Sequence, residues 1–235
     1  MNKSILRKSL LFALLAFLAA GVWVSAVSAQ APLGRGDEEF QYRWHLRNIL
    51  GTLVGLFLPN RGDGHLTFKT DGNGHLRSEL TITSDVAKQG EFFRYGSEVD
   101  TRTLQPIRAW SAYSWHGRSK SKSEDITTNG VLDIASGIYA IRRDPPQKTR
   151  RMEIWSDGDV YPVDVIPQGF ETRTLADGRK VQVQKFSIRG VDIPDRERWK
   201  GRLDLWLARD EAATPVEILI SRNLADVRME LKSLR

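Results

Sequence analysis

Short stretches in which apolar and polar residues alternate recur along most of this chain, and they constrain its fold more than any other feature. The first, residues 38–47, reads EEFQYRWHLR, with three aromatic residues and a leucine on one face of an extended strand. Alternation with a period of two, rich in aromatic residues, is typical of a half-buried β-strand. We therefore expect strands to make up most of the structure.

The clearest pair of strands is 65–70 and 75–83, which flank Asp71-Gly72-Asn73-Gly74. Asp-Gly and Asn-Gly suit tight turns because hairpin turns require positive φ. The same kind of pattern predicts further strands at 92–101, 107–116, 119–127, 151–155, 160–166, 170–174, 180–188, 203–208, 215–222 and 226–234. The apolar stretch 49–58, which contains two glycines, fits a bend, a short helix or a strand.

One segment has helical periodicity instead. In residues 131–143, Ile134, Ile138 and Ile141 share one face of a helix. Asp133 suits the positive N-terminal end of the helix dipole, and two prolines after Asp144 stop the helix. We therefore predict a mainly β fold, either a single strongly curved antiparallel sheet or an open or closed β-barrel, with one central helix at about 131–143.

The first 29 residues have the organisation of a secretory signal peptide. Basic residues precede an uninterrupted apolar run from Leu10 to Val24, and small residues follow as far as Ala29. We expect cleavage after Ala29, export to the periplasm and no transmembrane span in the mature chain, although an uncleaved membrane anchor is the alternative. A flexible lead at 30–37 and a single β-rich domain at 38–235 would then remain.

Charge and cysteine content exclude several classes of function. The formal net charge of +6 includes three cations of the signal peptide, so the mature chain has 32 basic against 29 acidic residues, or +3. This excess is too small to predict a nucleic-acid partner. The chain has no cysteine, which rules out a disulfide scaffold, a thiolate zinc site and a lipid-modified cysteine.

Catalytic and cofactor motifs are missing from the sequence. It contains no nucleophile elbow, phosphate loop or dinucleotide fingerprint. A two-residue turn in the first hairpin would place His65 opposite Leu80, about 16 Å along the ladder from His75. We therefore predict no metal ion and no cofactor, and we assign no catalytic residue.

Tyr139 and Arg142 are the most suggestive polar pair, because they lie three residues apart on one face of the expected helix. Arginine could hold an anionic headgroup or a carboxylate there. The competing interpretation packs Tyr139 in the core and pairs Arg142 with an acid such as Asp133 or Asp210.

Three tryptophans complete the candidate ligand-binding residues: Trp110, Trp115 and Trp206. Because Trp110 and Trp115 are five residues apart, a regular strand puts them on opposite faces, and at least one could line a concavity. A curled sheet with surplus aromatic residues can hold an apolar ligand, although core packing explains most such residues. Residues 118–123 alternate Arg or Lys with Ser, which indicates a solvated edge strand or a contact with anionic lipid or polysaccharide.

Three landmarks occur in a recognisable order. They are the glycine-containing stretch 50–55, the helix residues Asp133, Ser136, Tyr139 and Arg142, and the late Leu205-Trp206-Leu207 with Asp210 and Pro215-Val216. This order resembles the bacterial family called domain of unknown function 3108, in which Leu often stands where this chain has Gly137. The resemblance covers most of 38–234 and implies an exported envelope protein with a curved antiparallel sheet. It implies no established reaction.

Together these features predict a non-catalytic envelope protein that binds an apolar or amphiphilic, lipid-like ligand or another envelope component. A carboxylate-based hydrolase acting on envelope glycan or lipid is the first alternative, since its two acids need not be close in sequence. An envelope assembly or scaffold protein is the second. No oligomeric state follows from the sequence.

Overall fold

A computed structural model describes residues 37–47, 61–85, 90–115, 117–222 and 225–232. All of them belong to one compact unit, Ala31–Arg235. Its elements are β1 (Glu38–Arg47), β2 (Arg61–Thr70), β3 (His75–Ser84), β4 (Phe92–Asp100), β5 (Pro106–Trp115), β6 (Arg118–Asp125), β7 (Val131–Leu132), α3 (Ile134–Arg143), β8 (Arg150–Ser156), β9 (Asp159–Thr174), β10 (Lys180–Gly190), β11 (Gly201–Ala208), β12 (Pro215–Arg222) and β13 (Ala225–Leu231).

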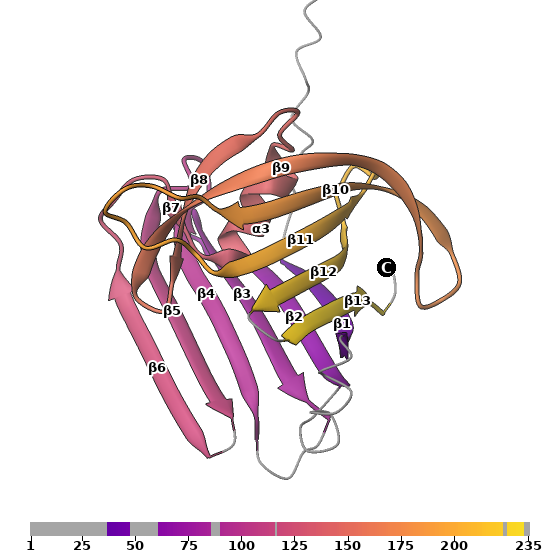
Figure 1. Cartoon of the computed structure of the whole chain (residues 1–235), viewed down its shortest axis with the longest axis horizontal. Coiled ribbons are helices and arrows are strands. Elements are labelled where there is room, and N and C mark those ends of the chain that lie inside the picture. The colour runs from indigo at the N-terminus through magenta and orange to yellow at the C-terminus, as the bar shows by residue number, and fades with distance from the viewer. Residues whose placement is uncertain (1–36, 48–60, 86–89, 116, 223–224, 233–235) are drawn as a thin grey trace, which may run out of the picture. The chain divides into compact units, whose positions relative to one another are not determined.

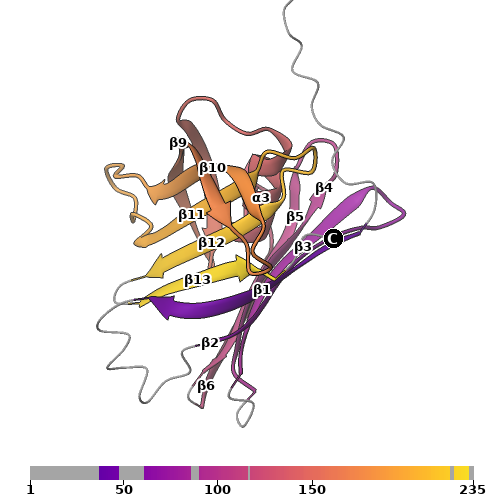
Figure 2. The same ribbon diagram turned by 90° about the vertical axis from the view of Figure 1, so that its right-hand side faces the viewer.

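The described strands form one bent sheet in the order β6-β5-β4-β3-β2-β1-β13-β12-β11-β10-β9-β8-β7. All neighbours are antiparallel except β7 and β8. Strands β1–β6 form one wall and β8–β13 the other (Figure 1), and α3 lies between the walls, which meet along β1 and β13 (Figure 2). The prediction of a mainly β fold with a curved antiparallel sheet and one central helix is confirmed. The sheet is not closed by backbone pairing, because β6 and β7 are its two ends.

Side chains close the seam between those two ends. Trp155 of β8 is buried with Ala109 of β5, Ile126 and Val131, and its Nε1 donates a hydrogen bond to Glu124 of β6 at 2.5 Å. The neighbouring residue Ile154 faces α3, so Trp155 lies on the opposite face of β8. The β7–β8 end therefore lies inside the β5–β6 end, as in a scroll.

Two predicted boundaries are wrong for identifiable reasons. Residues 160–166 and 170–174 belong to one strand, β9, because a register shift opposite Lys185 and Phe186 bends the strand without ending it. The helix begins at Ile134, because Val131 and Leu132 pair with β8 first. The apolar stretch 49–58 lies outside the described residues.

The first hairpin also differs from its predicted register. Thr70 pairs with Leu76, and His65 therefore lies opposite Thr81 rather than Leu80. The connection is longer than two residues because the Asp71 carboxylate accepts the backbone N–H groups of Asn73 and His75 at 2.9 and 2.8 Å. Among the described residues, no helix has the length and apolar character needed to cross a membrane.

The seam gives a stability prediction. We expect Trp155→Ala to lower the free energy of unfolding by about 3–5 kcal/mol, because it empties a buried indole site. Chemical denaturation measures the effect, with Phe170→Ala as control, since the Phe170 side chain is 59% exposed and its removal should cost less than about 0.5 kcal/mol. Similar small effects for both variants would contradict the packed seam.

Candidate functional site

Buried polar contacts fix the N-terminal end of α3. Asp133 is its N-cap, and the carboxylate accepts the backbone N–H groups of Ala135 at 3.0 Å and Ser136 at 2.9 Å. The Ser136 hydroxyl accepts the Asp133 N–H at 3.0 Å, which completes a capping box. Ser97 of β4 donates a further hydrogen bond to the same carboxylate at 2.6 Å. The start of the helix is thereby attached to the β1–β6 wall.

Arg142 fixes the other end of α3. Its side chain is fully buried and makes two 3.0 Å hydrogen bonds to the two carboxylate oxygens of Glu38 in β1. The same guanidinium donates to the backbone carbonyls of Ala212 at 2.8 Å and Ala213 at 3.1 Å, in the connection between β11 and β12. Arg142 therefore joins the helix to both walls. Its acidic partner is Glu38, and neither Asp133 nor Asp210 takes that place.

Tyr139 packs in the core beside this ion pair. Its ring lies 5.2 Å from the ring of Phe68 in β2, and burial raises the pKa of its hydroxyl. The Arg142 guanidinium lies 5.1 Å from the same Phe68 ring. Of the singled-out residues whose side chains the structure describes, only these two lie together, where α3 reaches Glu38 of β1 and Phe68 of β2.

The tryptophans lie elsewhere. Trp110 is on the outer face of β5, where its ring covers Gly96 and its Nε1 donates to Glu79 at 3.2 Å. Trp206 is on the outer face of β11, away from α3. The backbone of Trp115 pairs with Arg118, and its side chain lies outside the described part of the chain. The two described indoles therefore do not line the inside of the curved sheet.

The inside of the fold holds an apolar recess between α3 and the β8–β13 wall. It has a volume of about 20 Å³, room for roughly one water molecule. One carboxylate, that of Asp133, contributes to its lining, and it already accepts the capping hydrogen bonds and the bond from Ser97. The lining residues are Asp133, Ile134, Gly137, Ile138, Ile141, Met152, Ile154, Val163, Val165, Ile188, Trp199 and Leu203.

Gly137 makes this recess possible. A Cβ atom placed on Gly137 would meet no surrounding atom within 4 Å, although the residue is buried in the middle of the helix. Glycine inside a helix costs about 1 kcal/mol relative to alanine. The chain thus has open space at a helical position where a larger side chain would fit.

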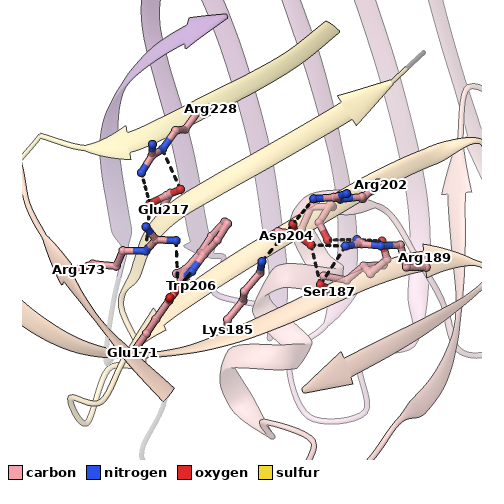
Figure 3. Close-up of polar contacts among 12 residues, drawn as sticks. Glu171, Arg173, Lys185, Ser187, Arg189, Arg202, Asp204, Trp206, Glu217 and Arg228 are labelled. Carbon is pink, nitrogen blue, oxygen red and sulfur yellow. Dashed lines mark hydrogen bonds and ion pairs between the residues drawn. The ribbon is translucent and has the colours of Figure 1, made fainter. Parts of the chain in front are cut away.

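A second polar region lies on the outer face of the β8–β13 wall (Figure 3). The buried carboxylate of Asp204 accepts hydrogen bonds from Ser187 at 2.7 Å and Arg189 at 2.6 Å. Burial raises the pKa of Asp204, but these hydrogen bonds and the charges of Arg189 and Lys185 outweigh it and hold the pKa below its ordinary value. We call Lys185, Arg189, Arg202 and Asp204 the basic cluster.

Trp206 separates the basic cluster from a second group of ions. Its ring lies 4.7 Å from Lys185 Nζ on one side and 4.7 Å from the guanidinium of Arg173 on the other, and its Nε1 donates to Glu171. Arg173 in turn lies 3.5 Å from Glu217. Trp206 is therefore held in a network of charged side chains on the outer face.

One group of described residues has the donor atoms of a metal site close together. His75 Nδ1 lies 3.3 Å from Asp71 Oδ2 and 3.1 Å from Glu98 Oε1. Those three side chains are the ones that could hold a divalent cation. As they stand, they place the His75 ring between two carboxylates at the turn of the first hairpin.

These observations define a class: a protein built from one bent antiparallel sheet around an inner helix, with an apolar recess beside that helix. The chain belongs to the family described as "Protein of unknown function (DUF3108)", whose profile matches residues 111–232. The resemblance noted from the helix and the late strands is thereby confirmed.

Among solved structures, the chain is similar to a beta-barrel-like protein of domain of unknown function DUF1849 from Brucella abortus. The identity is 11%, the TM-score is 0.42, and the match covers 83% of this chain and 95% of that one. No curated protein matches the sequence significantly.

Sequence reasoning missed two features of the candidate site. Glu38 stands 104 residues from Arg142, and nothing in the spacing singles it out among the acids. The recess is lined by residues from five separate elements and the 191–200 loop. The one available signal was Gly137, a glycine in the middle of an otherwise regular helical pattern.

The Arg142–Glu38 pair gives the second prediction. Arg142→Met should destabilise the fold by about 3–5 kcal/mol, because it leaves a carboxylate without its buried partner. Arg150→Met is the matched control, since Arg150 makes one surface ion pair with Asp144 at 2.7 Å and should cost about 1 kcal/mol or less. If urea unfolding gave both variants the same loss of unfolding free energy, Arg142 would not hold the walls together.

Gly137 gives the third prediction. We expect Gly137→Ala to raise the free energy of unfolding by about 0.5–1 kcal/mol, because alanine favours the helix and its methyl group enters open space. Thermal and chemical denaturation measure the change. A destabilised variant would mean that the space beside Gly137 is filled.

Proposed function

We propose that the protein is exported to the periplasm and binds an apolar or amphiphilic, lipid-like ligand in the recess beside α3. The observation that carries the proposal is the recess itself, lined by ten apolar side chains, Gly137 and Asp133. Small-molecule sites are usually concave and mostly apolar with a few polar groups, and the lining has that composition. Support for export comes from the organisation of residues 1–29.

A ligand must widen the recess, because about 20 Å³ does not admit an acyl chain. The hydrogen bonds of Asp133 attach the start of the helix to β4 of the opposite wall. Across the recess, the lining residues of β8, β9 and β10 are apolar: Met152, Ile154, Val163, Val165 and Ile188. A ligand can replace such contacts without breaking hydrogen bonds. We infer that the β8–β10 side yields and the capped start of the helix stays in place.

The chemistry of the lining favours a neutral apolar group inside the recess. The Asp133 carboxylate already accepts the hydrogen bonds that cap the helix, and an anionic head group beside it would be repelled. A carboxylate-based hydrolase would need a second acid near Asp133, and the recess lining provides no other carboxylate among the described residues. A scaffold protein would need no such recess.

The fourth prediction tests the ligand. Protein produced with its own residues 1–29 and purified from the periplasmic fraction should begin at Gln30 and carry envelope lipid detectable by native mass spectrometry. The delipidated protein should bind a fluorescent long-chain fatty acid. Gly137→Leu should weaken that binding at least tenfold, because its side chain occupies the recess.

Phe170→Ser is the matched control, since Phe170 is an exposed apolar residue outside the recess lining. It should bind the fatty acid as the unmodified protein does. A Gly137→Leu variant that is folded by circular dichroism and binds equally well would contradict the proposed site. Absence of both bound lipid and probe binding would favour the scaffold alternative.

A further inference from the structure

Three cations converge on one buried carboxylate on the outer face of β10 and β11 (Figure 3). The Asp204 side chain is 0% exposed, with Arg189 Nη2 2.6 Å from Oδ1. Arg202 Nη2 lies 2.9 Å and Lys185 Nζ 3.5 Å from Oδ2. The basic cluster therefore carries three positive charges against one negative charge.

The positions of Arg189 and Arg202 mean that the excess positive charge destabilises the sheet. Arg189 and Arg202 are direct partners in the β10–β11 register, and like charges directly opposite one another destabilise a sheet. Asp204 compensates one charge only. The neighbouring acid on β9, Asp164, already pairs with Arg151 at 2.6 Å. Nothing else described in this part of the face neutralises the remaining charge.

The rest of the same face is not cationic. Beyond Trp206, Arg173 and Arg228 meet three carboxylates: those of Glu171, Glu217 and Glu230. The positive excess is therefore local to the basic cluster and does not follow from the small net charge of the chain.

The members of the basic cluster differ in what they offer a ligand. Arg189 directs its donors inward, to the carbonyls of Ile188 and Leu203 and to Ser187 and Asp204. Lys185 and Arg202 have side chains 29% and 50% exposed. The buried Asp204 carboxylate holds Lys185 and Arg202 close together, because both lie against its Oδ2 atom. Their other N–H groups remain available to a ligand from solvent.

We propose that Lys185 and Arg202 bind an oxyanion of the phosphate type, and that Asp204 and Arg189 position them. A doubly charged oxyanion would balance the excess of the cluster, and its oxygens accept from ammonium and guanidinium groups together. The group could belong to a soluble phosphate or to a phospholipid headgroup. This site lies on the face opposite the recess and does not depend on the proposed function.

Two probes at low ionic strength test the site. Inorganic pyrophosphate is titrated by calorimetry, and phosphatidylcholine vesicles with and without phosphatidylglycerol are used in co-sedimentation. We expect at least one of the phosphate probes to bind, and Lys185→Gln/Arg202→Gln to weaken that binding at least tenfold. The affinity of Arg202→Lys for the same probe should stay within a few-fold of that of the unmodified protein, because lysine keeps the positive charge.

Arg77→Gln/Arg94→Gln is the matched control, because it removes two exposed cations from the outer face of the other wall. It should change binding by less than twofold. Binding of pyrophosphate assigns a soluble phosphate, and binding only to phosphatidylglycerol vesicles assigns a headgroup. If neither probe binds, or if the control double variant weakens binding equally, the proposal is wrong. Gly137→Leu should leave this binding unchanged.

Discussion

The ion pair between Arg142 and Glu38 is the contact on which the arrangement of helix and sheet depends. One guanidinium satisfies a carboxylate of β1 and two carbonyls between β11 and β12. Since β1 and β13 are the strands along which the two walls meet, this contact sets how closely the walls approach around α3. The polar cap at Asp133 fixes the other end, and the apolar side chains between these points fill most of the remaining space but leave the recess beside Gly137.

The recess follows from that arrangement. A helix held at both ends cannot move to fill a gap beside its middle. Because Gly137 has no side chain, open space therefore remains beside it. The glycine lowers helix stability, yet the rest of the helix is well capped and buried. A fold that only needed a stable core would be better served by alanine or a larger residue there, and the ligand-binding proposal rests on this point.

Local patterns predicted the strands, and they failed where the answer depends on contacts between distant segments. Alternation located nearly every strand, because most of them bury one face, although β6 is exposed on both. It could not show that β6 and β7 do not pair with each other, since the seam between them is closed by Trp155 and its neighbours from three other segments. The outward positions of Trp110 and Trp206 were set by sheet register. The helix pair Tyr139 and Arg142 was found from spacing, but its partner Glu38 came from a strand 104 residues away.

Photo-crosslinking with a diazirine-bearing long-chain fatty acid would report where the apolar chain lies. We expect labelled peptides from the two sides of the recess, at Ile138 of α3 and at Met152 and Ile154 of β8. Labelling of the outer face instead, around Phe170 or Trp206, would contradict it, as would labelling that is unchanged in Gly137→Leu.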